Sequence, residues 1–243
     1  MASMSLGIPI QNVRNGSAAR KWVVAQSYDV ELAAKDALTS EKIMLEIATH
    51  ATSRLISQLC SNKGITNKVI DAIWKNNPNE DMARRLAHNP RTSPIMLKTI
   101  GLFSERVGNL TIKGVIMRNQ NTPPDYLTSA LFTETDWNLH YRDHKFYAHC
   151  NPSTPIVDVI KSLTWVRVET PGHIKYILDK RKKDIQPLID PWMAVGFSSR
   201  QSLVLAACEI PTEEIAQVKD LPFAWIVNLY SADFTWRLEN LLF

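Results

Sequence analysis

The chain has 243 residues, of which 45% are apolar, and a net charge of +4. This composition is typical of a globular protein with a core and excludes an intrinsically disordered chain. Eight glycines are too few for an all-β fold built on tight turns. The cysteines Cys60, Cys150 and Cys208 lack CxxC spacing, which predicts neither a disulfide framework nor a zinc site.

No membrane or export signal is visible in the sequence. Residues 1–10 lack a charged n-region followed by an apolar run, and the apolar run 203–208 is far too short to span a bilayer. We therefore expect a cytoplasmic protein without membrane contact. The first 208 residues carry 26 basic and 18 acidic side chains, and residues 209–243 carry 2 and 6. A basic body of this kind is compatible with an anionic partner.

The N-terminal part of the sequence predicts a loose tail followed by helices. Residues 1–16, with a turn at Asn15-Gly16, are expected to be flexible, and residues 17–243 to form one domain. Helices are predicted over 18–26, 28–38 and 40–49. They depart from the motif described next, as capping helices of a repeat protein do.

A degenerate repeat of about 30 residues dominates residues 59–163. Its marker is an asparagine at positions 62, 89, 119 and 151, with spacings of 27, 30 and 32 residues. Apolar residues stand three positions before and eight positions after each asparagine, as expected for helices that share a core. These apolar residues are Leu59, Leu86, Ile116 and Ala148 before it, and Ile70, Leu97, Leu127 and Val159 after it.

The segment around each asparagine predicts a tight corner between two helices. The asparagine is expected to end the first helix in a left-handed conformation, and Pro90 and Pro152 prevent its continuation. A hydroxyl residue is then expected to cap the second helix, with a proline at its first position. The predicted cap and proline pairs are Ser93-Pro94, Thr122-Pro123 and Thr154-Pro155, the last in an alignment that requires a one-residue shift.

These features predict an all-α fold, a short right-handed α-solenoid of stacked helix pairs. In the divergent part, residues 164–243, helices are predicted from Thr170-Pro171 onward and over 187–195. A corner is expected at 198–202, a helix start at Thr212, and a last helix capped by Ser231 and ending at residue 243.

The corner Asn-Pro-x-Thr-Pro followed by an apolar helix resembles the leucine-rich repeat variant family and, more broadly, HEAT-like α-solenoids. The resemblance covers about 40% of the chain, residues 59–163. It implies a bacterial or bacteriophage origin and a binding surface rather than a reaction. The cysteine cluster of some members is absent, so no iron–sulfur site is carried over and no cofactor is expected.

Residues 136–150 form the densest polar segment. His140 and His144, four apart on a helix, are weak candidates for metal ligands beside Asp136 or Asp143, and ordinary surface histidines are the favoured alternative. Trp137 beside Asp136 resembles the aromatic and carboxylate pair of HEAT-like DNA glycosylases. A single pair does not define a site, and no known catalytic motif is found, so no enzyme is predicted.

Basic residues on the second halves of the repeats are the candidates for binding a partner. They recur at or before the corners, where a solenoid presents a ladder of side chains, although a merely exposed column fits as well. A basic run at 180–183 is expected at a helix C-terminus, where cations are favoured. The candidates are Arg84, Arg85, His88, Lys113, Arg118, Arg142, Lys145, Lys180, Arg181, Lys182 and Lys183.

The sequence favours a non-enzymatic adaptor or inhibitor that grips another protein through its solenoid surface. The alternative is a nucleic-acid-binding protein that uses a basic concave face. Cations that converge on one stripe would favour nucleic acid, and a face of mixed charge would favour a protein. The oligomeric state is not predicted.

Overall fold

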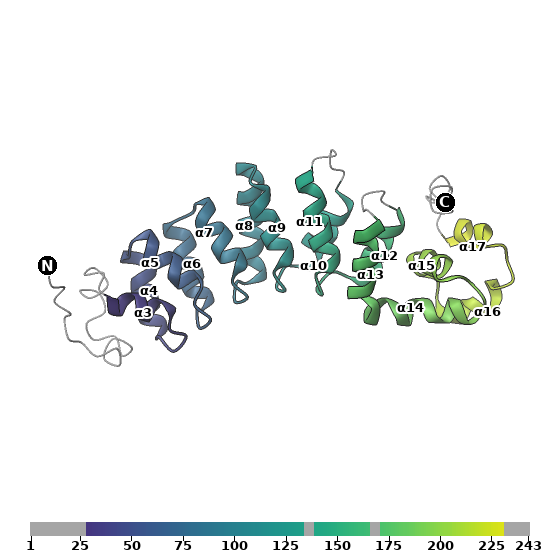
Figure 1. The fold of residues 1–243 in the computed structure, drawn as a ribbon, viewed down its shortest axis with the longest axis horizontal. Coiled ribbons are helices and arrows are strands. Elements are labelled where there is room, and N and C mark those ends of the chain that lie inside the picture. Colours follow the sequence, from purple (N-terminus) through teal and green to yellow (C-terminus); the bar gives the residue numbers. More distant parts are fainter. Residues whose placement is uncertain (1–27, 134–138, 166–170, 231–243) are drawn as a thin grey trace. The chain divides into compact units, whose positions relative to one another are not determined.

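A computed structural model of the chain describes residues 28–133, 139–165 and 171–230 (Figure 1). It divides into two compact units, Met1–Pro123 and Pro124–Phe243, each of which is described by itself. The described residues form helices and connecting segments without strands, which confirms the all-α prediction. None of the described helices has both the length and the apolarity needed to cross a bilayer.

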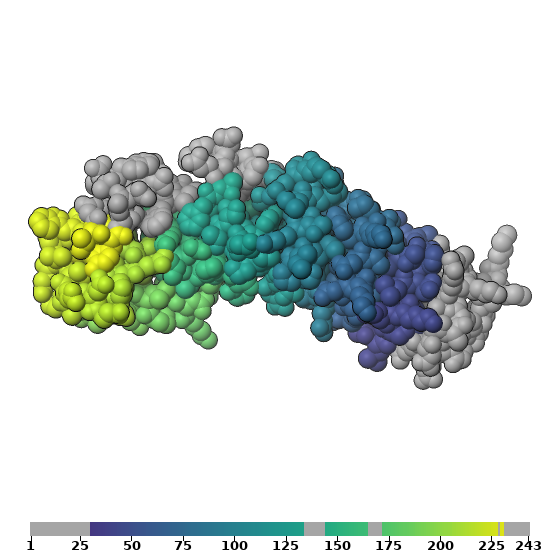
Figure 2. All heavy atoms as spheres, turned by 180° about the vertical axis from the view of Figure 1, so that it is seen from behind, coloured from purple at the N-terminus to yellow at the C-terminus, as the bar shows by residue number. Residues whose placement is uncertain are grey.

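The N-terminal unit stacks helices in chain order. One layer has α3 against α5, α5 against α7 and α7 against α9, while α4 packs on α6 beside it. In the space-filling view, where colour follows residue number, successive segments of this unit lie next to one another and distant segments do not interleave (Figure 2). Its helices are α3 (Tyr28–Lys35), α4 (Glu41–His50), α5 (Ser53–Cys60), α6 (Asn67–Asn76), α7 (Glu80–His88), α8 (Pro94–Val107) and α9 (Leu110–Arg118).

The C-terminal unit pairs α11 with α13 and α10 with α12, and α15 packs against both α12 and α14. Two apolar clusters, one around Ile160 and Ile189 and one around Trp192 and Leu205, form its core. Its helices are α10 (Pro124–Phe132), α11 (Leu139–Cys150), α12 (Ile156–Trp165), α13 (Pro171–Lys180), α14 (Lys182–Ala194), α15 (Ser199–Ala207), η1 (Thr212–Glu214), α16 (Ile215–Val218) and α17 (Phe223–Tyr230).

The apolar columns of the repeat are confirmed. All eight residues predicted to face the core, four before and four after the corner asparagines, are 0% exposed. Removing such side chains from water is the main stabilising contribution to a stack of helices that individually are too short to be stable. The second helix begins five residues after the asparagine in every copy, at Asn67, Pro94, Pro124 and Ile156.

The corner asparagines do not act as the sequence predicts. Asn89 and Asn119 have extended backbone (φ −75° and −73°), not the left-handed conformation. Their buried amides instead join successive corners. The Nδ2 of Asn89 donates to the carbonyls of Cys60 (2.6 Å) and Asn62 (3.2 Å), and its Oδ1 accepts from the N–H of Arg91 (2.8 Å). We call this series of residues the corner ladder.

The same three bonds recur in the neighbouring corners, where the Oδ1 atoms of Asn62 and Asn119 accept from the N–H groups of Gly64 (2.7 Å) and Asn121 (2.9 Å). Asn119 donates to the carbonyls of Ala87 and Asn89, at 2.8 and 2.9 Å. Asn62 donates to those of Ala34 and Asp36, both at 2.9 Å. Each corner therefore supplies carbonyls to the next and an amide to the previous one, which satisfies buried polar groups that would otherwise be costly.

Two of the three hydroxyls predicted to cap a helix, those of Thr122 and Thr154, instead bond backward to the preceding helix. Thr92, Thr122 and Thr154 each donate to the carbonyl six residues earlier, at 2.5 Å. Each stands three residues after its asparagine, so the copies align without the predicted one-residue shift. Ser93 does cap α8, with Pro94 at its first position, as predicted. Pro123 and Pro155 lie one residue before the first turn instead.

The ladder has two members that the sequence analysis missed. Asp36 accepts from the N–H of Leu38, and Thr39 donates to the carbonyl of Ala33, which reproduces the corner pattern with an aspartate. Helix α4 begins five residues after Asp36, with Ser40 at its N-cap position. In the C-terminal unit Arg181 donates through Nη1 to the carbonyls of His149 and Asn151, at 3.2 and 2.6 Å. An arginine thus occupies the place of a ladder asparagine.

Residues after 164 match the predictions in part. Helix α13 begins at Pro171, and Ser198 starts α15 with a capping box completed by Gln201. Helix α14 begins at 182 rather than 187 and contains Pro187 and Pro191 in its interior, each without an N–H to donate. Helix α17 was not predicted. The predicted tail 1–16, the helix 18–26 and the Ser231 cap lie outside the described residues.

Candidate binding surface

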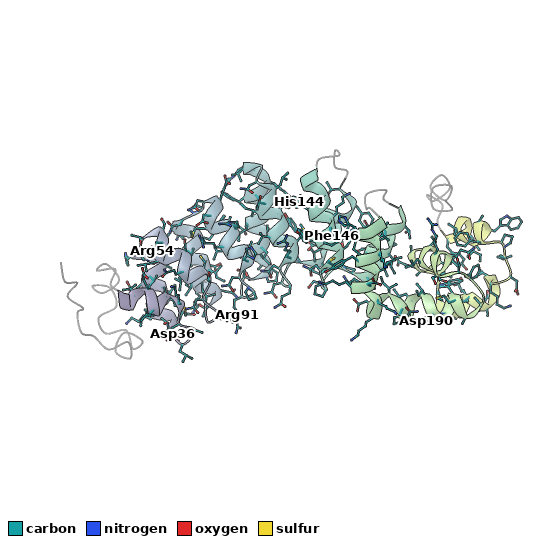
Figure 3. All side chains as sticks on the ribbon, viewed as in Figure 1. Asp36, Arg54, Arg91, His144, Phe146 and Asp190 are labelled. Atoms are coloured by element: carbon teal, nitrogen blue, oxygen red, sulfur yellow. The ribbon has the colours of Figure 1, made fainter. Side chains whose placement is uncertain are left out.

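One exposed column of side chains follows the corner ladder in the N-terminal unit. We call it the edge column: Lys35, Ser61, His88 and Arg118, each the residue directly before a ladder residue. All four are exposed, whereas the ladder residue that follows each of Ser61, His88 and Arg118 is buried. Asp36 and Arg91, in the corners that follow α3 and α7, lie along the same edge of the unit (Figure 3). The repeat therefore holds these side chains at regular positions on a fixed backbone.

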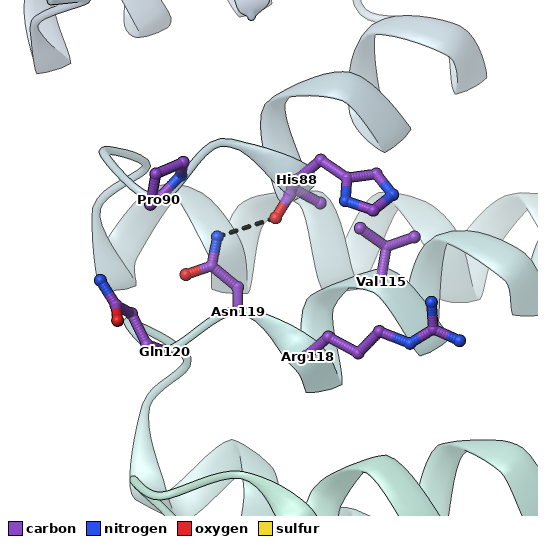
Figure 4. A pocket seen from close by; sticks show the side chains of 7 residues that line it. His88, Pro90, Val115, Arg118, Asn119 and Gln120 are labelled. Carbon is purple, nitrogen blue, oxygen red and sulfur yellow. Dashed lines mark hydrogen bonds between the residues drawn. The ribbon is translucent and has the colours of Figure 1, made fainter. Parts of the chain in front are cut away.

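Two pockets lie on the edge column. The smaller, of about 200 Å³, lies between the ends of α7 and α9 and is lined by His88, Val115, Arg118 and Gln120, among others. The ladder bond from Asn119 to the carbonyl of Ala87 forms its wall, and His88 and Arg118 project to the same side (Figure 4). Its shape is thus set by backbone that the ladder holds in place.

The larger pocket, which we call the basic pocket, has a volume of about 450 Å³. Helices α3, α5 and α7 each contribute to it. Its lining includes three cations and no carboxylate. The lining residues are Lys35, Arg54, Ser57, Gln58, Ser61 and Arg85.

Three of the predicted cations, on the helices that precede the corner asparagines, are paired with acids. Asp81 accepts from Arg84 (3.1 Å) and Arg85 (2.8 Å), and these hydrogen bonds, with that of Arg85 the stronger influence, lower the pKa of its carboxyl below the usual range. Lys113 lies 3.6 Å from Glu105. The face is therefore of mixed charge, and these cations do not form an uninterrupted basic stripe.

Two predicted binding residues of the C-terminal unit are buried. Lys145 is 3% and Arg181 5% exposed, so neither presents its side chain on an open surface. Arg181 also donates to the carbonyl of Thr154 (3.1 Å) and to the carboxylate of Asp184 (2.7 Å). It joins backbone segments, which is a structural role. The side chain of Arg142 lies outside the described residues.

The basic run at 180–183 spans the junction of two helices. Lys180 ends α13, whereas Lys182 and Lys183 begin α14, contrary to the prediction that all lie at a helix C-terminus. All three lysines are exposed. Lys180 lies 5.9 Å from the ring centroid of Tyr176, which in turn lies 5.5 Å from that of Phe146. This surface combines cations with an aromatic pair.

His149, beside Arg181, is buried and neutral. Its Nδ1 lies 2.7 Å from the carbonyl of Lys145, so Nδ1 carries the proton and donates, while Nε2 accepts from the hydroxyl of Ser162 at 3.1 Å. Burial, reinforced by the charges of Lys145 and Arg181, lowers the pKa of His149 from 6.5 to about 4. Protonation of His149 would place a positive charge in a buried site, close to two other cations.

We expect the C-terminal unit to lose stability in mild acid because of His149. Below pH 6.5 the unfolded chain binds a proton that the folded state refuses until about pH 4. The stabilisation is therefore complete above pH 6.5 and lost between pH 6.5 and 4, with a total of about 3 kcal/mol. Urea unfolding at several pH values measures it. In His149→Asn the slope over this range should shrink, and an unchanged slope would assign the pH dependence to other groups.

The metal and enzyme hypotheses gain little from the described residues. His144 is 5% exposed. Among the described residues, no group of three His, Cys, Asp or Glu side chains is arranged so that it could hold a metal ion. The side chain of His140 and all of Asp136 and Trp137 lie outside the described part. Burial raises the pKa of the Cys60 thiol to about 12 and that of Cys208 to about 11, so both thiols are protonated at neutral pH.

Comparisons with known proteins give no relative. No family model, no curated protein and no solved structure matches the chain.

Proposed function

We propose that the chain is a non-enzymatic binding module that grips another protein through the edge column of its N-terminal unit. The proposal includes a right-handed α-solenoid arrangement of the helix pairs, of the leucine-rich repeat variant or HEAT-like kind, and a cytoplasmic location. The supporting observation is the corner ladder of the N-terminal unit, whose buried bonds fix the backbone while the residue before each of its ladder positions stays exposed.

A rigid edge suits recognition of a folded or extended protein segment. A backbone that is already held in place loses little conformational entropy on binding, so more of the contact energy appears as affinity. Pockets such as that between His88 and Arg118 accept individual side chains of a partner. The mixed charge produced by Asp81 and Glu105 beside the cations matches a protein surface better than a polyphosphate.

Nucleic-acid binding is the second candidate, and it is favoured by one observation. Lys180 lies beside the exposed ring of Tyr176, and Lys182 and Lys183, the next lysines in the chain, are exposed as well. Single-stranded nucleic acid contacts cations and stacking rings of this kind in other proteins. A matching continuous stripe is absent from the described face of the N-terminal unit, where acids intervene.

The test uses the full chain and two variants with the same change in charge. Arg118→Glu alters the edge column, and Lys75→Glu, at an exposed position of α6 outside both pockets, is the control. We expect proteins retained from a lysate by the native chain and the control to be lost with Arg118→Glu. Thermal unfolding of each variant is the control that checks whether the fold is kept.

A second measurement addresses the alternative. Labelled single- and double-stranded DNA is titrated at about 50 and 200 mM salt, because phosphate binding weakens steeply between these concentrations. We expect weak binding that Arg118→Glu leaves unchanged. Tight, steeply salt-dependent binding, combined with protein capture that ignores Arg118→Glu, would refute the proposed function in favour of nucleic acid.

A further inference from the structure

The basic pocket has a feature that the edge column alone does not explain. Its three cations come from different helices, Lys35 from the end of α3, Arg54 from the start of α5 and Arg85 from α7. They are separated by 19 and 31 residues in the chain, so the packing of successive first-layer helices brings them together. The pocket is thus a product of the fold and not of a local basic run.

The charge within this pocket is only partly compensated. Arg54 bonds to Glu31 at 2.8 Å and Arg85 to Asp81 at 2.8 Å, but neither acid belongs to the lining. The ammonium group of Lys35 makes no ion pair with a described residue. A carboxylate that enters the pocket would meet Lys35, which has no acidic partner among the described residues, and two arginines whose partner acids lie outside the lining.

The wall of the pocket also offers an unused acceptor. The Oε1 atom of Gln58 is buried and has no hydrogen-bond partner among the described residues. A buried acceptor without a donor destabilises the folded state, so a ligand that supplies an N–H would relieve that cost. Ser61, which also lines the pocket, provides a hydroxyl that can donate or accept, and Ser57, whose hydroxyl donates to the carbonyl of Ser53 (2.7 Å), can accept.

These two features select the chemistry of the ligand. A peptide supplies both a carboxylate, for Lys35 and the arginines, and backbone N–H groups, for Gln58. A phosphodiester backbone supplies negative charge but no hydrogen-bond donor for Gln58. A volume of about 450 Å³ is sufficient for one acidic side chain and the adjoining backbone.

We infer that the basic pocket binds an acidic peptide segment of the partner, with a Glu or Asp carboxylate between Lys35, Arg54 and Arg85 and a backbone N–H on Gln58 Oε1. This inference rests on the proposed function and names the chemistry of the partner. It makes the N-terminal unit selective for segments rich in acidic residues, because the lining carries three cations and no carboxylate.

The direct test measures, by fluorescence anisotropy, how tightly the full chain binds a labelled peptide of alternating Glu and Ala with blocked termini. We expect Lys35→Glu and Arg54→Glu each to weaken binding by about tenfold or more. Gln58→Met, which keeps the size of the side chain, should weaken it by about threefold without altering the salt dependence. Lys75→Glu, with the same change in charge outside the pocket, should stay within about twofold.

Two results would overturn the inference. One is a peptide affinity that Lys35→Glu and Arg54→Glu do not change, or no measurable peptide binding to the native chain. The other is an oligothymidylate of equal charge that binds as tightly and is weakened by the same variants, which would assign the pocket to phosphate. If Arg54→Glu unfolds the chain, Arg54→Gln replaces it, since it removes the charge without placing a second carboxylate beside Glu31.

Failure of this inference is distinct from failure of the proposed function. Protein capture that Arg118→Glu abolishes, together with a peptide that does not bind, leaves the edge column as the binding surface and removes only the acidic-peptide assignment. Peptide binding of the expected specificity, together with capture that ignores Arg118→Glu, places recognition at the pocket and refutes the role of the column.

Discussion

Replacing Asn89 with alanine should destabilise the N-terminal unit by about 3 kcal/mol or more. The asparagine is 4% exposed, and its amide bonds to the carbonyls of Cys60 and Asn62 and to the N–H of Arg91. Alanine leaves these groups without a partner in a place where water has little access. Urea unfolding followed by circular dichroism measures the change in the free energy of unfolding.

The chain offers a matched control for this substitution. Asn121 also donates through Nδ2 to two carbonyls of the previous corner, those of Pro90 (2.7 Å) and Thr92 (3.1 Å). It lies nearer the surface, where water can take over these bonds, so Asn121→Ala should cost below about 1 kcal/mol. Equal costs at the two positions would show that burial of the ladder amide contributes nothing.

A third variant separates the shape of Asn89 from its donor. In Asn89→Asp the carboxylate is nearly isosteric but faces the carbonyls of Cys60 and Asn62 with an acceptor. The expected cost is at least that of alanine, because repulsion is added to the lost bonds. A variant as stable as the native protein would mean that the side chain fills space and does not join the corners.

The repeat could be predicted because its signals are local. The spacing of the asparagines and the apolar residues three before and eight after them follow from helical periodicity, and all eight apolar positions are buried. The role of the asparagine could not be read in the same way. Its partners, such as the carbonyl of Cys60 for Asn89, lie 29 residues away, so a bond that crosses repeats leaves no pattern within one corner.

The missed members of the ladder have a common physical reason. Asp36 keeps the acceptor of asparagine, and Arg181 keeps and multiplies its donors. Each serves only part of the role, and neither is the asparagine that marks the repeat in the sequence. The basic pocket was missed for a related reason. Lys35 and Arg54 were not among the predicted binding residues, because only the packing of three helices brings them beside Arg85.

Arg181 provides the second large effect, in the C-terminal unit. Its guanidinium donates to the carbonyls of His149, Asn151 and Thr154, and its Nε donates to the carboxylate of Asp184. Arginine suits this place because its planar group carries five donors in a fixed geometry. With 5% of the residue exposed, the charge is stabilised by these acceptors and not by water.

Arg181→Met should therefore cost about 3–5 kcal/mol, since three buried carbonyls lose their donor. The informative variant is Arg181→Lys, which keeps the charge. One ammonium group cannot reach all three carbonyls in the geometry of the guanidinium, so we expect lysine to recover less than half of the loss. Lys182→Met, at the exposed next position, should change the free energy of unfolding by less than about 0.5 kcal/mol.

The stability of Arg181→Lys decides whether the positive charge of Arg181 or the geometry of its guanidinium joins the two corners. If Arg181→Lys is as stable as the native protein, a positive charge near the carbonyls is sufficient, and the correspondence with the corner asparagines is accidental. If it is nearly as unstable as Arg181→Met, the forked geometry is essential. Arg181 then does for the corner at Asn151 what Asn119 does for the corner at Asn89: it donates to the same two carbonyl positions from the following helix pair.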